Sequence, residues 1–223
     1  MNKIIKTEDG SHTIMSDKFE VLYHSSFGAI QESRHIFIDA GLKYISETNK
    51  NVSILEMGFG TGLNALLTAI EAEESGISVD YIGIEAYPLS KKIVDELNYH
   101  EILKASNTKS YLNKLHNVNE LETDEINEHL RFQLIIDKLE NVNLESDLFD
   151  VIYFDAFDPE VQPNLWDEEI FSKIYKACKK GGVLLTYSCK GIVKRALKSA
   201  GFTLEKLPGP IGKREILRAI KSK

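Results

Sequence analysis

Residues 51–64 read Asn51-Val52-Ser53-Ile54-Leu55-Glu56-Met57-Gly58-Phe59-Gly60-Thr61-Gly62-Leu63-Asn64. The apolar, partly β-branched residues 52–55 predict a buried strand that ends at Glu56. Glycine then stands at every second position before the helix-forming residues 63–74, which predicts a turn and a helix start. Glycines let a ligand approach the main chain, and a helix start offers free N–H donors. The stretch therefore predicts a site for a nucleotide or a nucleoside-like cofactor.

The spacing of Gly58, Gly60 and Gly62 narrows the choice of cofactor. A dinucleotide site reads G-x-G-x-x-G and a phosphate loop contains Gly-Lys, whereas this loop reads G-x-G-x-G and has no lysine. The carboxylate of Glu56 would gain nothing beside an anionic pyrophosphate, but it suits a ligand that carries a sulfonium and an ammonium. The loop resembles motif I of the class I S-adenosylmethionine (AdoMet)-dependent methyltransferases. The alternative is a strand-to-helix turn that binds no ligand.

The composition is that of one ordinary globular domain. The 223 residues are 43% apolar and 27% charged, which allows one sizeable core and a small extra element. No run of about 18 apolar residues occurs and the N-terminus is too polar for a signal peptide, so we expect a cytoplasmic protein with no membrane partner. The two cysteines, Cys178 and Cys189, predict neither a disulfide framework nor a zinc site.

Charge is distributed unevenly along the chain. Residues 176–223 contain thirteen Lys and Arg against two Glu, a balance of +11, whereas the preceding residues carry −18 and the whole chain −7. A local basic surface is what phosphate backbones recognise, and a negative total can hide it. A set of solvated basic faces explains the same count equally well.

Two more predicted strands end in an acid, as the glycine strand does. Residues 79–84 precede Glu85, and a carboxylate at the end of the second strand of a βαβ unit is placed to bind both hydroxyls of an adenosine ribose. The alternative for Glu85 is an acid that only caps a loop. Residues 132–136 precede Asp137, at the position where related folds place a group that contacts adenine.

A fourth predicted strand, residues 150–154, leads to Asp155. The carboxyl ends of buried parallel strands are where open α/β sheets bind ligands, so any chemistry is expected at Asp155. The following loop contains Phe157 and leads to Trp166, and both aromatic side chains could stack on a base. A lone tryptophan at a helix start is more often a packing residue, and we place that interpretation first for Trp166.

The chain before the glycine strand predicts an extension, residues 1–48. Asp9-Gly10 is a signature of a tight hairpin turn, so a small N-terminal hairpin is expected. Residues 19–23 predict a further extended segment, and residues 30–46 predict a helix that covers the sheet. The polar residues of this helix are expected to face solvent, with a place in the cofactor pocket as the alternative.

Residues 49–223 form the expected main domain. Pro88 suits the first turn of a helix that runs to about residue 99. Residues 101–130 are polar and irregular, and predict a mainly helical elaboration. A basic helix at 188–199 is followed by two extended segments with a rigid cationic connection, which predicts a closing antiparallel hairpin.

Short motifs follow one another along nearly the whole chain. They are Thr7-Glu8-Asp9-Gly10-Ser11, Gly28-Ala29-Ile30-Gln31-Glu32-Ser33, Gly58-Phe59-Gly60-Thr61-Gly62-Leu63-Asn64, Glu85 with Pro88-Leu89, Asp155-Ala156-Phe157-Asp158-Pro159 with Leu165-Trp166, Thr186-Tyr187-Ser188, and Lys213-Arg214-Glu215. In this order the motifs resemble the methyltransferase domain of the MnmC-type tRNA-modifying enzymes. One departure is Ala156, where that family has glycine, and the added methyl bears on how closely the substrate approaches.

The resemblance implies a fold and a reaction. The fold is α/β, a Rossmann-like class I methyltransferase with a mostly parallel seven-stranded sheet, helices on both faces, a C-terminal antiparallel hairpin and a small N-terminal β-hairpin extension. The reaction transfers methyl from AdoMet to the aminomethyl nitrogen of 5-aminomethyl-(2-thio)uridine at the tRNA wobble position and leaves S-adenosyl-L-homocysteine. The resemblance is to a stand-alone methyltransferase without the flavin-dependent oxidoreductase domain, so neither FAD nor a metal is expected.

The resemblance and the residue patterns together assign roles along the chain. Asp155 is expected to orient the amine and accept its proton. The wobble base is expected to swing out of its stack, while basic side chains hold phosphates of the anticodon stem-loop. The expected cofactor-binding residues are Glu56, Gly58, Gly60, Gly62, Asn64, Glu85, Asp137 and Asp155. The expected substrate-binding residues are Phe157, Trp166, Lys190, Lys194, Arg195, Lys213 and Arg214.

Two other functions stay open on the sequence alone. The first is transfer of a group to a small amine or polyamine on the same scaffold, which would need no tRNA. The second is a degenerate methyltransferase fold that only binds, against which the intact glycines and strand-end acids count.

Overall fold

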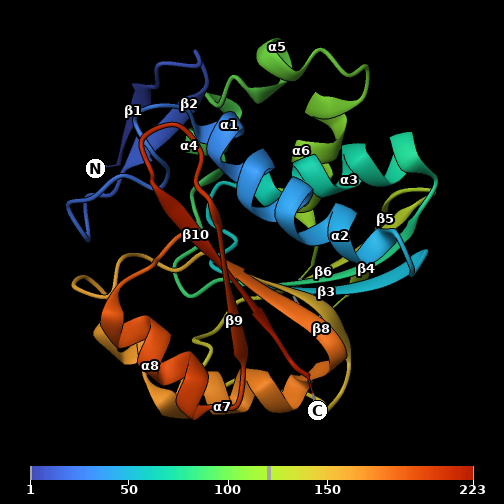
Figure 1. The fold of residues 1–223 in the computed structure, drawn as a ribbon. Coiled ribbons are helices and arrows are strands. Elements are labelled where there is room, and N and C mark those ends of the chain that lie inside the picture. Colours follow the sequence, from blue (N-terminus) through green and yellow to red (C-terminus); the bar gives the residue numbers. More distant parts are fainter. Residues whose placement is uncertain (1, 120–121, 223) are drawn as a thin grey trace.

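Within residues 2–119 and 122–222, which the computed structural model describes, eight strands form one sheet in the order β5-β6-β4-β3-β7-β8-β10-β9 (Figure 1). A separate antiparallel hairpin of β1 and β2 precedes them. The strands are β1 Lys3–Lys6, β2 His12–Met15, β3 Asn51–Met57, β4 Ser78–Ile84, β5 Thr123–Asn127, β6 Leu130–Ile135, β7 Phe149–Phe154, β8 Cys178–Thr186, β9 Thr203–Pro208 and β10 Glu215–Ile220.

The middle of the sheet is parallel and both of its edges are antiparallel. Strand β3 pairs in parallel with β4 on one side and with β7 on the other. In this register Met57 lies beside Ile84 and Phe154, the last residues of the two neighbouring strands. The three strands therefore end at the same edge of the sheet, and the residues that follow them are brought together there.

Helices cover both faces of the sheet (Figure 1). The continuous helix of α1, η1 and α2 (residues 29–46) lies on one face together with α3 and α6, and α7 and α8 lie on the other. The helical elements are α1 Ala29–Ser33, η1 Arg34–Leu42, α2 Lys43–Ser46, α3 Leu63–Ser75, α4 Lys91–Asp95, α5 Tyr99–Leu103, α6 Thr108–Asn117, η2 Pro163–Trp166, α7 Glu168–Ala177 and α8 Gly191–Ser199.

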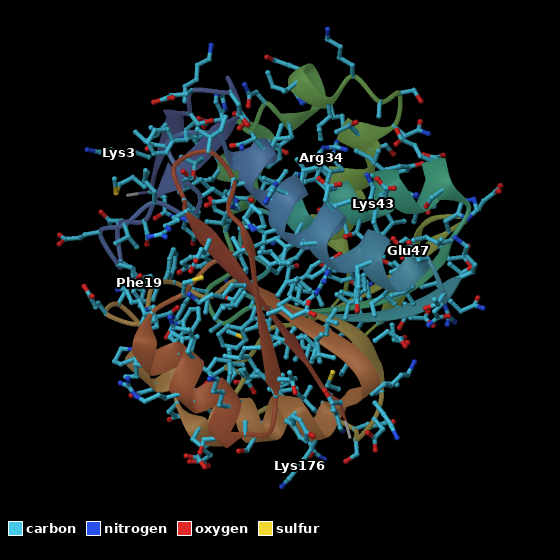
Figure 2. All side chains as sticks on the ribbon, viewed as in Figure 1. Lys3, Phe19, Arg34, Lys43, Glu47 and Lys176 are labelled. Carbon is cyan, nitrogen blue, oxygen red and sulfur yellow. The ribbon has the colours of Figure 1, made fainter. Side chains whose placement is uncertain are left out.

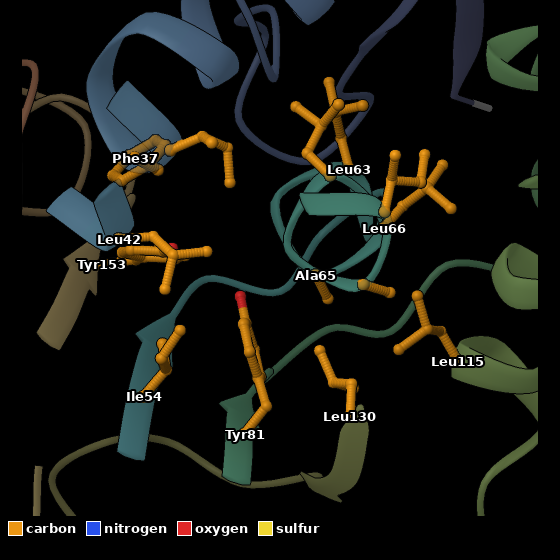
Figure 3. Close-up of a cluster of buried hydrophobic side chains, with 14 of the residues drawn as sticks. Phe37, Leu42, Ile54, Leu63, Ala65, Leu66, Tyr81, Leu115, Leu130 and Tyr153 are labelled. Carbon is orange, nitrogen blue, oxygen red and sulfur yellow. The ribbon is translucent and has the colours of Figure 1, made fainter. Parts of the chain in front are cut away.

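A hydrophobic core fills the space on each side of the sheet. On the first side, Tyr81 and Tyr153 rise from the strands towards the helices and are at most 1% exposed (Figure 3). On the second side, Trp166 packs edge-on against Phe154 with ring centroids 4.9 Å apart. Burial of each such aromatic ring stabilises the fold by roughly 1.5–3 kcal/mol, so both layers hold the sheet rigid beneath the site.

The predicted fold class is confirmed, and the structure corrects several predicted elements. The sheet has eight strands rather than seven because β5 forms within the region expected to be helical. Its sequence is polar and Ile126 is its one buried residue, so no apolar alternation marks it as a strand. The helix predicted over residues 30–46 has a π-helical middle, η1. The helix predicted over residues 88–99 is short, and the extended segment at 19–23 is a loop with one isolated bridge at Leu22.

The hairpin turn of the extension is tied to the first helix by one carboxylate. Asp9 accepts hydrogen bonds from the backbone N–H of Ser11 at 2.9 Å and from the hydroxyls of Thr7 and Ser11. Its other oxygen accepts from the backbone N–H of Gln31 at 3.0 Å, in the first turn of α1. The side chain thereby closes the turn and caps the helix at the same time.

Asp9→Ala is predicted to destabilise the protein by roughly 1–3 kcal/mol, since it leaves helix and turn N–H groups without an acceptor. Burial alone would raise the pKa of Asp9, but the bonds from Ser11, Thr7 and Gln31 hold it below the usual 3.8. The stabilisation is therefore present above pH 3.8 and is lost as the pH falls through the lowered pKa. Urea denaturation at pH 7 and below pH 4 measures it. The control is Glu8→Ala, at the exposed neighbour; equal effects of both variants would contradict the role.

Candidate active site

The glycine loop between β3 and α3 curls tightly against the end of β7. Its three glycines have φ angles of +89°, +50° and +73°, a range that favours glycine. A Cβ atom on Gly58 would lie 2.6 Å from the carbonyl oxygen of Asp155, so no other residue fits there without displacing β7. Gly62 begins α3 in the left-handed conformation. Gly58 and Gly60 line a hollow at the strand ends.

Glu85 follows β4 and braces this loop. One carboxylate oxygen accepts from the backbone N–H of Gly60 at 2.8 Å and the other from the N–H of Tyr87 at 2.7 Å. The side chain is 8% exposed, and burial raises its pKa while these hydrogen bonds oppose the rise. A carboxylate offers about four acceptor sites, so Glu85 can hold the loop and still accept from a ligand hydroxyl.

The ends of β3 and β7 are joined through one amide. The side-chain NH₂ of Asn64 donates to Oε1 of Glu56 and to Oδ2 of Asp155, both at 2.9 Å. Burial raises the pKa of Glu56 well above its usual value, and the nearby Asp155 and Glu85 raise it further, while Asn64 opposes them. Glu56 is fully buried and lies behind the site, so its influence on the site passes through Asn64 and through its charge.

Asp155 is the half-buried carboxylate of this group. Burial raises its pKa to about 7, and the hydrogen bond from Asn64 limits the rise. A carboxylate that titrates near neutral pH can both take up and release a proton under physiological conditions, which is what general acid–base catalysis requires. Sequence reasoning placed Asp155 at this edge, and the structure adds its pKa and its link to Asn64.

Three adjoining hollows run along the strand ends. The inner hollow lies against the glycine loop, Glu85 and Asp155. The outer hollow shares Tyr87 with the inner one and continues away from Asp155, past Leu139. The acidic hollow shares Asp155 with the inner one and continues in the opposite direction, towards Glu32, Asp158, Tyr187 and Lys213. Asp155 thus stands at the junction of two spaces that could hold two different molecules.

Aromatic side chains from the N-terminal extension form the wall over the crevice. Phe157 packs against Phe19 at a centroid distance of 4.9 Å and against Tyr23 at 5.0 Å. Phe19, which lies at the left edge of Figure 2, also packs against Tyr87 at 5.7 Å. Phe157 therefore lies between the inner and acidic hollows. Sequence reasoning missed Phe19 and Tyr23, because their segment carries no motif and its place at the site depends on the fold.

Several residues expected to bind RNA have other partners in the structure. Trp166 is 1% exposed and its indole N–H donates to the carbonyl of Phe157 at 2.8 Å, which agrees with the packing interpretation. Lys190 forms ion pairs with Asp158 at 2.6 Å and with Glu160 at 2.7 Å. The indole ring is therefore not accessible to a base. The charge of Lys190 is compensated by the two carboxylates and is not free for a phosphate.

The basic C-terminal sequence does not form one basic surface. Within the described residues, six of its thirteen cations form ion pairs, and Lys176 lies far from Phe19 at the bottom of Figure 2. No ion pair is found within the described ranges for Lys194, Arg195 or Arg214, and both arginines are exposed. Of the five cations expected to bind RNA, these three remain available to a phosphate in the part of the chain that the structure describes.

Asp137 lies outside the crevice, on the surface. Strand β6 ends two residues earlier, at Ile135, and the carboxylate accepts from the N–H of Lys138 at 2.7 Å and from the amide of Asn141 at 2.8 Å. These two bonds hold the pKa of Asp137 below its usual value. The geometry favours a loop cap, and the outer hollow is instead lined by Leu139 from the same loop.

In residues 2–119 and 122–222, no group of three or more His, Cys, Asp or Glu side chains is placed to hold a metal ion. The helices of the same residues include none that is both long and apolar enough to cross a membrane.

The parallel sheet, the glycine loop and the strand-end acids define a class I methyltransferase fold. Residues 98–222 match the family described as S-adenosyl-L-methionine-dependent methyltransferase, and the chain belongs to this family as an MnmC-type methyltransferase domain. The crystal structure of MNMC2 from Aquifex aeolicus matches with a TM-score of 0.80 and 26% identity, over all of this chain and 70% of that one. Spermidine synthase from Thermotoga maritima, at 14% identity and a TM-score of 0.52, shares the fold.

Curated relatives carry the name tRNA 5-methylaminomethyl-2-thiouridine biosynthesis bifunctional protein MnmC. The protein of Leptospira borgpetersenii is 32% identical over 92% of this chain, and that of Burkholderia thailandensis is 32% identical over 96%. The match covers 33% and 34% of those two proteins. The chain therefore spans about a third of the length of the curated relatives that it matches.

The residues of the crevice fit AdoMet. Gly58, Gly60 and Glu85 line the inner hollow together, and Glu85 has acceptor capacity left for a ribose hydroxyl. Asp155 and Glu85 lie close enough to Glu56 for their negative charges to raise its pKa further. A bound cation would offset this repulsion. When bound, AdoMet supplies a methyl group on a positively charged sulfur.

Glu85→Gln is predicted to weaken AdoMet binding by roughly tenfold or more, because the amide loses one acceptor and turns an NH₂ towards a backbone N–H. Asp137→Asn removes the same charge from a strand-end acid outside the crevice and is predicted to change the affinity less than about twofold. Isothermal titration calorimetry with both variants measures the difference. Unchanged binding in Glu85→Gln, or an equal loss in Asp137→Asn, would contradict this division of roles.

Proposed function

We propose that the protein transfers a methyl group from AdoMet to the aminomethyl nitrogen of 5-aminomethyl-(2-thio)uridine at the wobble position of tRNA. The observation that carries the proposal is the place of Asp155 between the inner hollow, which fits the cofactor, and the acidic hollow. A carboxyl-lined space suits an amine, which is cationic until it loses a proton. The names of the relatives support tRNA as the carrier of that amine.

Asp155 would act on the proton of the acceptor amine. An ammonium has no free lone pair, so it must give up one proton before its nitrogen can attack a methyl group. With a pKa of about 7, Asp155 is a suitable acceptor, and the amide of Asn64 keeps its carboxylate oriented towards the junction of the hollows. The aromatic wall of Phe19, Tyr23 and Phe157 would keep water from the same space.

Lys194, Arg195 and Arg214 would contact the phosphates of the anticodon stem-loop. Lys194 and Arg195 lie on α8, while Arg214 lies in the connection between β9 and β10, which reaches the side of α1 and the N-terminal hairpin (Figure 1). The ion pairs found among the described residues include none of these three, so their charge is available to a phosphate.

Wild-type protein is predicted to convert the aminomethyl nucleoside of tRNA to the methylaminomethyl form, detected by nucleoside mass spectrometry after incubation with AdoMet. Asp155→Asn is predicted to lower kcat by roughly 10²-fold or more while AdoMet affinity stays within about threefold. Wild-type kcat/KM should fall as the pH drops below about 7, because the carboxylate is then protonated. Methylation of polyamines or other amines that carry no uridine would overturn the proposed substrate. Full activity of Asp155→Asn would overturn the proposed role of the carboxylate.

Reversal of charge at Lys194 and Arg195 to Glu is predicted to weaken tRNA binding by roughly tenfold or more near 0.1 M salt. The slope of log K against log salt should shrink by about one for each ion pair with a phosphate that the reversal removes. The control is reversal of charge at the exposed Lys176 and Lys180, which changes the net charge by the same amount at another place on the surface. Filter binding at several salt concentrations compares the two, and equal losses of affinity would show that net charge alone matters.

A further inference from the structure

The acidic hollow holds more negative than positive charge. Glu32, Asp155 and Asp158 line it, and Lys213 is the one Lys or Arg among the described residues that do so. Lys190, outside the lining, pairs with Asp158, so Glu32 and Asp155 are the two acids that face Lys213. His24 also lines it, but burial lowers the pKa of His24 to about 4, so its ring is neutral at pH 7. The hollow therefore suits a cation, and in the free protein this cation is the ammonium of Lys213.

Glu32 is a buried acid in the wall of this hollow. Its side chain is 11% exposed, and Oε2 accepts the backbone N–H of Ser25 at 2.8 Å, which fixes its orientation. Oε1 lies 2.9 Å from Nζ of Lys213, a residue from the opposite end of the chain. A buried carboxylate without a cation is costly, so Oε1 keeps a positive partner whenever it is charged.

Lys213 is free to leave this pair without a change of the backbone. Its side chain is 29% exposed and flexible, and its ammonium lies 5.0 Å from the centre of the ring of Tyr187, another residue that lines the hollow. The backbone beside it is held by hydrogen bonds, since the N–H of Lys213 donates to the carbonyl of Pro210 at 2.9 Å and the N–H of Gly209 to that of Arg214 at 3.1 Å. The connection between β9 and β10 therefore stays in place while the lysine side chain can rotate outwards.

We propose that Glu32 is the ammonium-binding residue of the acceptor site, and that Lys213 occupies this position in the free protein as a stand-in for the substrate. The inference rests on the function proposed above. The aminomethyl ammonium of the substrate replaces Nζ of Lys213 beside Glu32, and Lys213 turns out to a phosphate of the same RNA. Glu32 then holds the ammonium beside Asp155, which accepts one of its protons. A uridine without the aminomethyl group brings no cation and cannot displace the lysine.

The test compares the affinity of two tRNAs that differ only in the aminomethyl group, in the presence of S-adenosyl-L-homocysteine so that no transfer occurs. Wild-type protein is expected to prefer the aminomethyl form by roughly tenfold or more. Glu32→Gln is expected to bind both forms equally within about threefold. Asp39→Asn removes a carboxylate from the exposed side of the same helix and is expected to keep the wild-type preference. A preference retained by Glu32→Gln would overturn the inference.

Lys213→Met provides a second measurement with a substrate that has no phosphate. The free nucleoside 5-aminomethyluridine no longer competes with the lysine, so its KM is expected to fall by roughly threefold or more, whereas the KM for tRNA rises. AdoMet affinity, unchanged in both variants, reports that the fold is intact. An unchanged or higher KM for the nucleoside would contradict the proposed replacement of the Lys213 ammonium by that of the substrate. A wild-type protein that does not methylate aminomethyl-tRNA would instead refute the proposed function.

Discussion

The hydrogen bonds from one amide, Asn64, hold the end of β3 to the end of β7 and so set the geometry on which the site depends. Three neighbouring parallel strands each deliver a carboxyl group to one edge, Glu56, Glu85 and Asp155. Packed closely and largely away from water, these groups repel one another, and burial raises the pKa of each. N–H donors from Asn64 and Gly60 offset part of this cost. The negative charge that these donors leave uncompensated favours a cationic ligand at this edge.

The N-terminal extension completes this edge instead of forming a separate unit. Asp9 fastens its hairpin to the first helix, and the following loop brings Phe19 and Tyr23 over the crevice. The same helix carries Glu32 into the acidic hollow, where it meets Lys213 from the last hairpin. The N-terminal extension and the last hairpin therefore meet at the proposed acceptor site, although the sheet that lies between them in the chain carries the glycine loop and the strand-end acids.

The basic C-terminal sequence shows how the fold redistributes charge. Lys190 and Lys213 belong to ion pairs beside the crevice, where they lower the cost of neighbouring carboxylates. Lys194, Arg195 and Arg214 keep their charge on the surface. The linear count of positive residues thus overstates the positive charge that is left unpaired.

Local patterns in the sequence determined the fold class, the glycine loop and the acids Glu85 and Asp155, because apolar periodicity, glycine spacing and strand ends are properties of adjacent residues. They did not determine β5, whose polar residues become a strand only by pairing with β6. Nor did they place Asp137, since β6 ends two residues before it and turns the carboxylate to solvent. The aromatic wall and the pair of Glu32 with Lys213 were decided by tertiary structure alone, because their members lie far apart in the chain and meet only when the sheet has formed.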